Sequence, residues 1–211
     1  GTQLAYTNGP NAQPVIHVPT LIPPPAYAHV CPYIFRSADP SIQPESFGFL
    51  DTLGLKSIVL LSIEYPSKQL EVYCAKNHIE IHHFGIERRW PSPNNLESSS
   101  SASSHLFFSS QEINSFSVLE SIVKDALELL LDVRNHPVLV TDMCVYGTHI
   151  SAGIFETGTL LGCLRKIQGW NLSSILFEYR SFAGSLARSA NERFIEVRLH
   201  ILSYNFRCLI L

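Results

Sequence analysis

Two continuous apolar runs constrain the fold of this chain more than any other feature. They are KSIVLLSI (56–63) and PVLV (137–140), both rich in β-branched residues and both without the polar alternation of a half-exposed strand. Strands of this kind are buried on both faces, which occurs mainly in parallel sheets covered by helices on each side. Helical periodicity appears between the strand patterns, most strongly at 117–136. The sequence therefore predicts an α/β protein with a central, mainly parallel sheet and helices on both faces.

The remaining patterns alternate in the same way. Ser67 is placed to N-cap one predicted helix, and Gly54 is placed to end another. We expect strands at 33–37 and 79–86, and helices at 45–54, 67–78, 157–169, 172–184 and 190–199.

The length of 211 residues and the apolar content of 45% suffice for one core, so we predict a single domain over 27–200. Residues 1–26 are rich in proline and turn formers, and we expect an extended or disordered lead-in there. The Ser-rich segment 92–114 has little apolar content, which predicts a disordered surface insertion. The segment 201–211 is an apolar tail to which we assign no structure.

Composition excludes several classes of partner. The net charge is −3 and the pI is about 6.3, so the chain lacks the basic footprint of proteins that bind nucleic acid or an anionic membrane. No apolar run reaches the ~18 residues of a membrane span. The five cysteines are odd in number and form no CxxC pair, which argues against a zinc site or a disulfide framework. We expect a cytoplasmic protein with buried thiols, no metal and no cofactor.

The segment TDMCVYGTHISAGIFETG (141–158) lies between the strand pattern 137–140 and a helix pattern that begins near Thr157 and Gly158. In open α/β sheets, ligands bind beyond the carboxyl ends of the strands. The N-terminus of a helix presents free N–H groups that favour anions. We therefore expect any functional site in this segment.

Several segments carry a family resemblance, and together they span about residues 23 to 196. They are PPPAYAHVCPYIFRSADP (23–40), FLDTLGLKSIVLLS (49–62), IEIHHFGIE (79–87), LELLLDVRNHPVLV (127–140) and TGTLLGCLRKIQGWNLSSILFEYRSFAGSLARSANERFIE (157–196). Through them the chain resembles the plant and fungal atypical dual-specificity phosphatases, a tyrosine-phosphatase family that includes the fungal oxidant-induced cell-cycle-arrest proteins. The resemblance implies the cysteine dual-specificity-phosphatase fold. It also implies phosphotyrosine or inositol pyrophosphate as substrates of active members.

Phosphatases of this kind need a cysteine, five residues, and then an arginine that is usually followed by Ser or Thr. The thiolate attacks phosphorus, and loop N–H groups and the helix dipole keep it ionised. The arginine clamps the phosphoryl oxygens and stabilises the transition state. A nearby carboxylic acid protonates the leaving oxygen.

One alignment to this pattern makes Cys144 the nucleophile. The run CVYGTHIS then keeps Cys144, Gly147, His149 and Ser151 in family positions, but Ile150 takes the place of the arginine. This alignment also leaves extra residues on both sides, before the cysteine and before the helix.

The second alignment treats VYGTHISA (145–152) as one insertion, and we prefer it because both flanks stay in register. Gly153 then falls on the family glycine, Asp142 on the nucleophile and Glu156 on the arginine. Both alignments lose the arginine, and losing one preorganised transition-state donor costs roughly 10²–10³ in rate. The second also adds two carboxylates, which repel a phosphate dianion.

The general acid is also poorly defined. Glu87 is one candidate for this role. In WPS (90–92), Ser92 stands where classical tyrosine phosphatases have an aspartate, but this three-residue match is weak. His82 and His83 are adjacent in a predicted strand, so they face opposite sides and cannot chelate one metal together.

Three hypotheses follow. The first is a pseudophosphatase that acts through protein contacts in signalling or stress response, as a complex with related phosphatase-family proteins. Its site binds weakly or not at all, and the ligand it would take is a phosphorylated or inositol-phosphate compound. The second is an active cysteine phosphatase that uses Cys144. The third is that residues 145–152 and the tail after Glu196 are not authentic, which leaves Asp142 and Glu156 in an inactive site.

Overall fold

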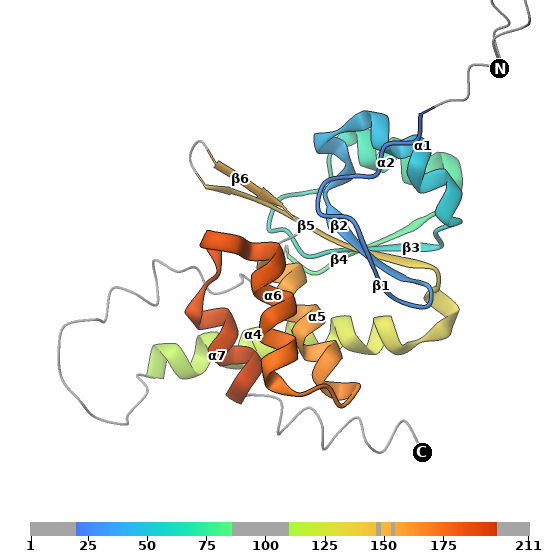
Figure 1. Ribbon diagram of the computed structural model, residues 1–211. Coiled ribbons are helices and arrows are strands. Elements are labelled where there is room, and N and C mark those ends of the chain that lie inside the picture. The colour runs from blue at the N-terminus through green and yellow to red at the C-terminus, as the bar shows by residue number, and fades with distance from the viewer. Residues whose placement is uncertain (1–19, 86–109, 147–148, 153–154, 198–211) are drawn as a thin grey trace, which may run out of the picture.

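The structure is a computed structural model that describes residues 20–85, 110–146, 149–152 and 155–197 (Figure 1). Side chains are described over the same ranges except 110–119 and 144–152. Most of the predicted lead-in, residues 92–109 of the Ser-rich segment and the tail 201–211 lie outside the described residues. Among the described residues, no helix is both long enough and apolar enough to cross a membrane.

The sheet confirms the predicted topology. Its strands follow the order β1-β2-β5-β3-β4, and β6 pairs with β5 outside this path. β2, β5, β3 and β4 are parallel to one another, and β1 is antiparallel at the edge. The strands are β1 (Ala28–Cys31), β2 (Ile34–Ala38), β3 (Ser57–Leu60), β4 (Glu80–His83), β5 (Val138–Tyr146) and β6 (His149–Ala152). Neither β1 nor β6 is predicted from the sequence.

The helices lie on both faces of this sheet (Figure 1). They are α1 (Phe47–Leu50), α2 (Lys68–Asn77), α4 (Ser110–Leu131), α5 (Phe155–Ile167), α6 (Leu172–Ala183) and α7 (Ser189–Val197). The helix predicted at 45–54 is a short α-helix between two 3-10 turns. Both predicted caps are confirmed, because Ser67 Oγ accepts the Leu70 N–H at 3.1 Å and Gly54 ends its turn with a left-handed φ of 58°.

The central strands divide the core in two, as the absence of polar alternation predicts. Ile58 and Leu139 pack with α1 and α2 on one face of the sheet. Their neighbours Val59 and Val140 pack with α4, α5, α6 and α7 on the other face. All four side chains are fully buried, so each central strand is held from both sides.

Several predicted boundaries need correction. The helix predicted at 117–136 ends at Leu131, and Val133–Asn135 form a separate 3-10 turn. Helix α4 begins at Ser110, so the last five residues of the predicted insertion, 110–114, are helical. Composition alone placed them in the Ser-rich segment, although they continue the helix that follows. Helix α5 begins at Phe155, two residues earlier than expected.

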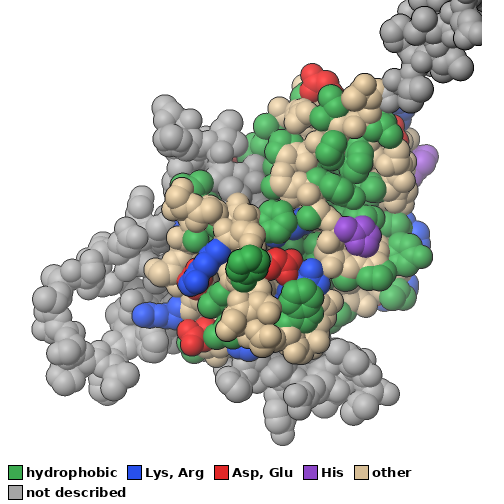
Figure 2. Space-filling view, viewed as in Figure 1, with side chains coloured by type: hydrophobic (Ala, Val, Ile, Leu, Met, Phe, Trp, Pro, Cys, Tyr) green, Lys and Arg blue, Asp and Glu red, His purple; other side chains and the backbone are tan. Residues whose placement is uncertain are grey.

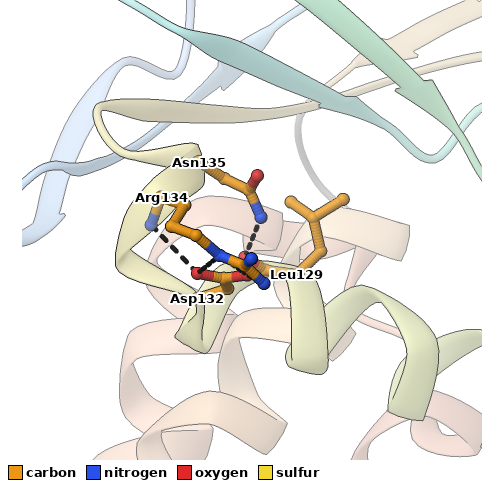
Figure 3. A network of polar contacts seen from close by, with 4 residues as sticks. All are labelled: Leu129, Asp132, Arg134 and Asn135. Carbon is orange, nitrogen blue, oxygen red and sulfur yellow. Dashed lines mark hydrogen bonds and ion pairs between the residues drawn. The ribbon is translucent and has the colours of Figure 1, made fainter.

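A tight polar turn leads from α4 into β5 (Figure 3). Asp132 accepts the Arg134 N–H at 3.0 Å and forms an ion pair with the Arg134 guanidinium at 2.6 Å. The Asn135 amide donates to the Leu129 carbonyl at 3.0 Å. These contacts fix the reversal of the chain immediately before β5, the strand that carries the candidate site.

Candidate functional site

Asp142 marks the carboxyl end of the parallel part of the sheet. Its register partner is Ala38, the last residue of β2, and the side chain of Asp142 is fully buried. Thr141, one residue earlier, pairs with Leu60 at the end of β3. Asp142 therefore lies where this fold class places its ligands.

The carboxylate of Asp142 binds the N-terminus of helix α5. The Thr157 N–H donates to Asp142 Oδ2 at 2.7 Å across fifteen positions of sequence, and Thr157 is also fully buried. The first N–H groups of a helix have no partner within the helix, and they attract negative charge. An anion of the protein itself thus occupies the anion-binding end of α5.

Glu156 adds a second carboxyl group in the first turn of α5. Its Oε2 atom is buried and has no hydrogen-bond partner among the described residues. Burial, reinforced by the charge of Asp142, raises the pKa of Glu156 to about 8. A phosphate dianion at this end of α5 would meet negative charge and a strongly desolvated carboxyl group.

Two arginines that the sequence did not mark as site residues, Arg36 and Arg188, interact electrostatically with these carboxyl groups. Arg36 is only 1% exposed, and its guanidinium lies 3.5 Å from the centre of the Phe182 ring. Burial lowers the pKa of Arg36 to about 10, while the charge of Asp142 acts in the opposite direction. Arg188 lies 3.3 Å from the Phe155 ring centre, and its charge favours the ionised form of Glu156. The one sequence signal for Arg36 was a charge inside the strand pattern YIFRS.

Beyond Asp142, β5 continues into an antiparallel hairpin that we call the ribbon, made of residues 143–146 and β6. Its register pairs Met143 with Ala152, Cys144 with Ser151, and Val145 with Ile150. Figure 1 shows the ribbon projecting from the end of the sheet. The segment 141–156 is therefore largely strand, whereas the phosphatase resemblance implies a phosphate-binding loop there.

The ribbon conflicts with an anion cradle built from CVYGTHIS (144–151). A phosphate loop needs successive N–H groups that converge on one point. In a ladder, backbone groups alternate in direction and pair across the strands. Cys144 lies in this extended ladder, outside the parallel sheet.

Ser62 holds the base of the ribbon against the sheet. Its hydroxyl oxygen accepts the Met143 N–H at 2.7 Å, and its carbonyl lies 2.6 Å from Nε2 of His83. Gly85 packs so tightly here that a Cβ atom would lie 1.6 Å from the Ser62 carbonyl oxygen. Ser62 therefore connects the ends of β3 and β4 with the start of the ribbon.

Of the other predicted site residues, some lie within the described part of the chain and some lie outside it. Gly158 is buried against Tyr179, where an added Cβ would lie 2.8 Å from the ring, so α5 and α6 pack closely at the site. Glu87 and Gly153 lie outside the described residues. His82 is 3.8 Å from the carboxylate of Glu80. Over the described part of the chain, no three His, Cys, Asp or Glu side chains form a group suited to a metal ion.

Comparisons with known proteins agree on the family and the fold. A model described as the tyrosine phosphatase family matches residues 21–199. The chain is 39% identical over 177 residues to inositol diphosphatase DSP5 of Arabidopsis thaliana, with 83% of this chain and 71% of that protein covered. It is 38% identical over 178 residues to inositol diphosphatase DSP4 of the same plant, with coverage of 83% and 73%.

A solved structure gives the same result. The core catalytic domain of the PP-IP phosphatase SIW14 from S. cerevisiae, in complex with citrate, matches with a TM-score of 0.63 and 27% identity. The match covers 89% of this chain and 96% of that domain. The predicted phosphatase resemblance and fold class are thereby confirmed.

Proposed function

This chain belongs to the tyrosine phosphatase family, and we propose that it is a member that has lost phosphoryl transfer and acts through protein contacts. We place this action in signalling or stress response, as a complex with related family proteins.

The buried contact between Asp142 and Thr157 is the observation that carries the proposal. In the second alignment, Asp142 stands in the place of the nucleophilic cysteine and Thr157 follows the place of the arginine. The 2.7 Å contact joins these two positions, as a closed phosphate loop would. Met143, two residues before the insertion, pairs with Ala152, the last residue of the insertion, which supports treating 145–152 as one added unit.

Two physical effects oppose catalysis at this site. The Asp142 carboxylate engages the helix N-terminus that would otherwise bind the phosphoryl oxygens. Glu156 replaces a cationic clamp by a group that is neutral or negative, which removes an interaction worth at least about 10²–10³ in rate. We therefore expect neither tight phosphate binding nor turnover.

The alternative remains a cysteine phosphatase that uses Cys144 on an inositol pyrophosphate or a phosphotyrosine. The named relatives support the choice of the first substrate, since DSP5 and DSP4 are called inositol diphosphatases. The extended ladder around Cys144 opposes this alternative.

The test measures phosphate release from an aryl phosphate and from an inositol pyrophosphate. The proteins compared are the wild type, Cys144→Ser, and a rebuilt variant that lacks 145–152 and carries Asp142→Cys and Glu156→Arg. We expect no release by the first two and measurable release by the third, which restores Cys-x5-Arg. Release by the wild type that disappears in Cys144→Ser would show an active phosphatase and overturn the proposal.

Peptide mass spectrometry of the native protein tests the hypothesis that residues 145–152 are not authentic. Detection of a peptide that contains them would establish the ribbon as part of the mature chain. Peptides that join Cys144 directly to Gly153 would instead restrict the inactivating changes to Asp142 and Glu156.

A further inference from the structure

Arg36 and Asp142 carry opposite charges on one face of the sheet. Arg36 on β2 is the register partner of Val140 on β5, and Asp142 follows Val140 by two residues. Register partners share a face, and so do residues two apart on a strand. Val140 packs with helices α4 to α7, so both charged side chains point toward these helices. There the Arg36 guanidinium lies 3.5 Å from the centre of the Phe182 ring on α6.

The Asp142 carboxylate is held by the kinds of groups that bind free anions. The Thr157 N–H donates to it at 2.7 Å from the first turn of α5. Burial lowers the pKa of Arg36, and Asp142 opposes this effect more than any other charged neighbour. Glu178 opposes it less, and its carboxylate also pairs with Arg165 at 2.8 Å. A helix N-terminus and a guanidinium both recognise carboxylates and phosphates.

This anion-binding arrangement is closed to solvent and has a donor in reserve. Asp142 and Thr157 are fully buried, and Arg36 is 1% exposed. Helix α6 lies over this side of the sheet, and the outer surface around it carries hydrophobic side chains next to acidic and basic ones (Figure 2). The buried Thr157 hydroxyl has no hydrogen-bond partner among the described residues. Buried polar groups normally have partners, so this hydroxyl indicates that the site can bind more than the tethered carboxylate uses.

We propose that Arg36 and the N-terminus of α5 form an anion receptor that still functions, and that Asp142 is its tethered ligand. The inference rests on the proposed function, in which Asp142 replaces the nucleophile, and it adds that anion binding has been retained. Because the ligand belongs to the same chain, its effective concentration is high and free anions are excluded. The receptor selects small monocarboxylates, since one carboxylate group fills it and the neighbouring Glu156 carboxyl group disfavours a dianion.

The test is rescue of Asp142→Ala by formate, which supplies the carboxylate that the substitution removes. Thermal unfolding is followed by circular dichroism, with sodium chloride of the same ionic strength as the reference. At about ten times its dissociation constant, formate should raise the folding equilibrium constant of Asp142→Ala about elevenfold. The melting temperature should then rise by about 3–6 °C relative to chloride. The wild type should melt at the same temperature in both salts, because Asp142 occupies its receptor.

Asp142→Asn is the matched control, since its amide fills the same space without a charge and leaves no room for formate. Asp142→Ser replaces Asp142→Ala if the alanine variant does not fold, because the serine hydroxyl can accept the Thr157 N–H. The proposal is overturned if formate stabilises neither of these two smaller variants, or if it stabilises Asp142→Asn or the wild type equally. Failure of the proposed function is observed separately, as release of phosphate by the wild type.

Discussion

The two halves of β5 differ in almost every physical respect, although they form one continuous strand. Residues 138–142 have parallel partners in β2 and β3 and are fully buried. Residues 143–146 have an antiparallel partner in β6 and project from the sheet. The change falls at Asp142, the residue that our proposal places at the position of the family's nucleophile. The antiparallel pairing that begins after Asp142 thus leaves the buried packing of the first half of β5 intact.

The largest effect is expected in the first half of β5. Leu139→Ala removes a fully buried side chain that packs in the core of α1 and α2. We expect the free energy of unfolding to fall by about 2–5 kcal/mol, as for other large-to-small core substitutions. Urea denaturation measures this change. If Leu139→Ala lowers the free energy of unfolding by less than deletion of 145–152 does, the contrast between the two halves of β5 is wrong.

Asp142→Ala tests the boundary between the two halves. It leaves the buried Thr157 N–H without its acceptor, which costs about 1–3 kcal/mol of unfolding free energy. Asp142→Asn is the control, since it keeps an oxygen acceptor and removes only the charge. We expect Asn to recover part of the loss in urea denaturation. Equal stability of Asp142→Ala and the wild type would show that the contact does not hold α5 to β5.

The pH dependence of stability reports on Glu156. Its folded pKa is about 8 against an ordinary value of 4.5, so the folded state retains a proton that the unfolded state has released. Stability should therefore decrease as the pH rises from about 4.5 to about 8 and level off above that. The measurement is the difference in unfolding free energy between the wild type and Glu156→Gln as a function of pH. A difference that does not change with pH would contradict this assignment.

The smallest effect is expected for deletion of 145–152. Met143, two residues before the deleted segment, is the register partner of Ala152, the last residue of that segment, so the chain enters and leaves the segment at neighbouring places. We expect the free energy of unfolding to change by no more than about 1 kcal/mol, since shortening a connection between two fixed elements changes closure entropy only slightly. Loss of cooperative unfolding would show that the ribbon stabilises the domain.

Sequence patterns predicted the buried strands and the helix ends that depend on neighbouring residues alone. The runs around Ile58 and Leu139 indicated strands buried on both faces, and Ser67 and Gly54 indicated helix ends, because these signals depend on neighbouring residues. The ribbon was missed because the segment was compared with a family loop. The segment carries a local hairpin signal of its own, apolar strand formers on both sides of Gly147.

The candidate site was predicted only in part. The alignment identified Asp142 and Glu156, but it gave no indication that the Asp142 carboxylate would bind the Thr157 N–H. That contact depends on the three-dimensional closure of the chain around the ribbon. Arg36 was missed for the same reason, since its neighbours Asp142 and Phe182 lie more than a hundred positions away in sequence.

The burial of Arg36 also restricts how a nucleophile can be lost at position 142. A cysteine thiolate and an aspartate carboxylate each supply one negative charge to the buried guanidinium. A neutral residue at this position would leave that cation with less compensation in a dry environment. Among substitutions that remove a nucleophilic cysteine, an acidic one therefore preserves the charge balance of the interior. If the proposed loss of the nucleophile occurred at position 142, stability of the fold alone would therefore favour an acidic replacement over a neutral one.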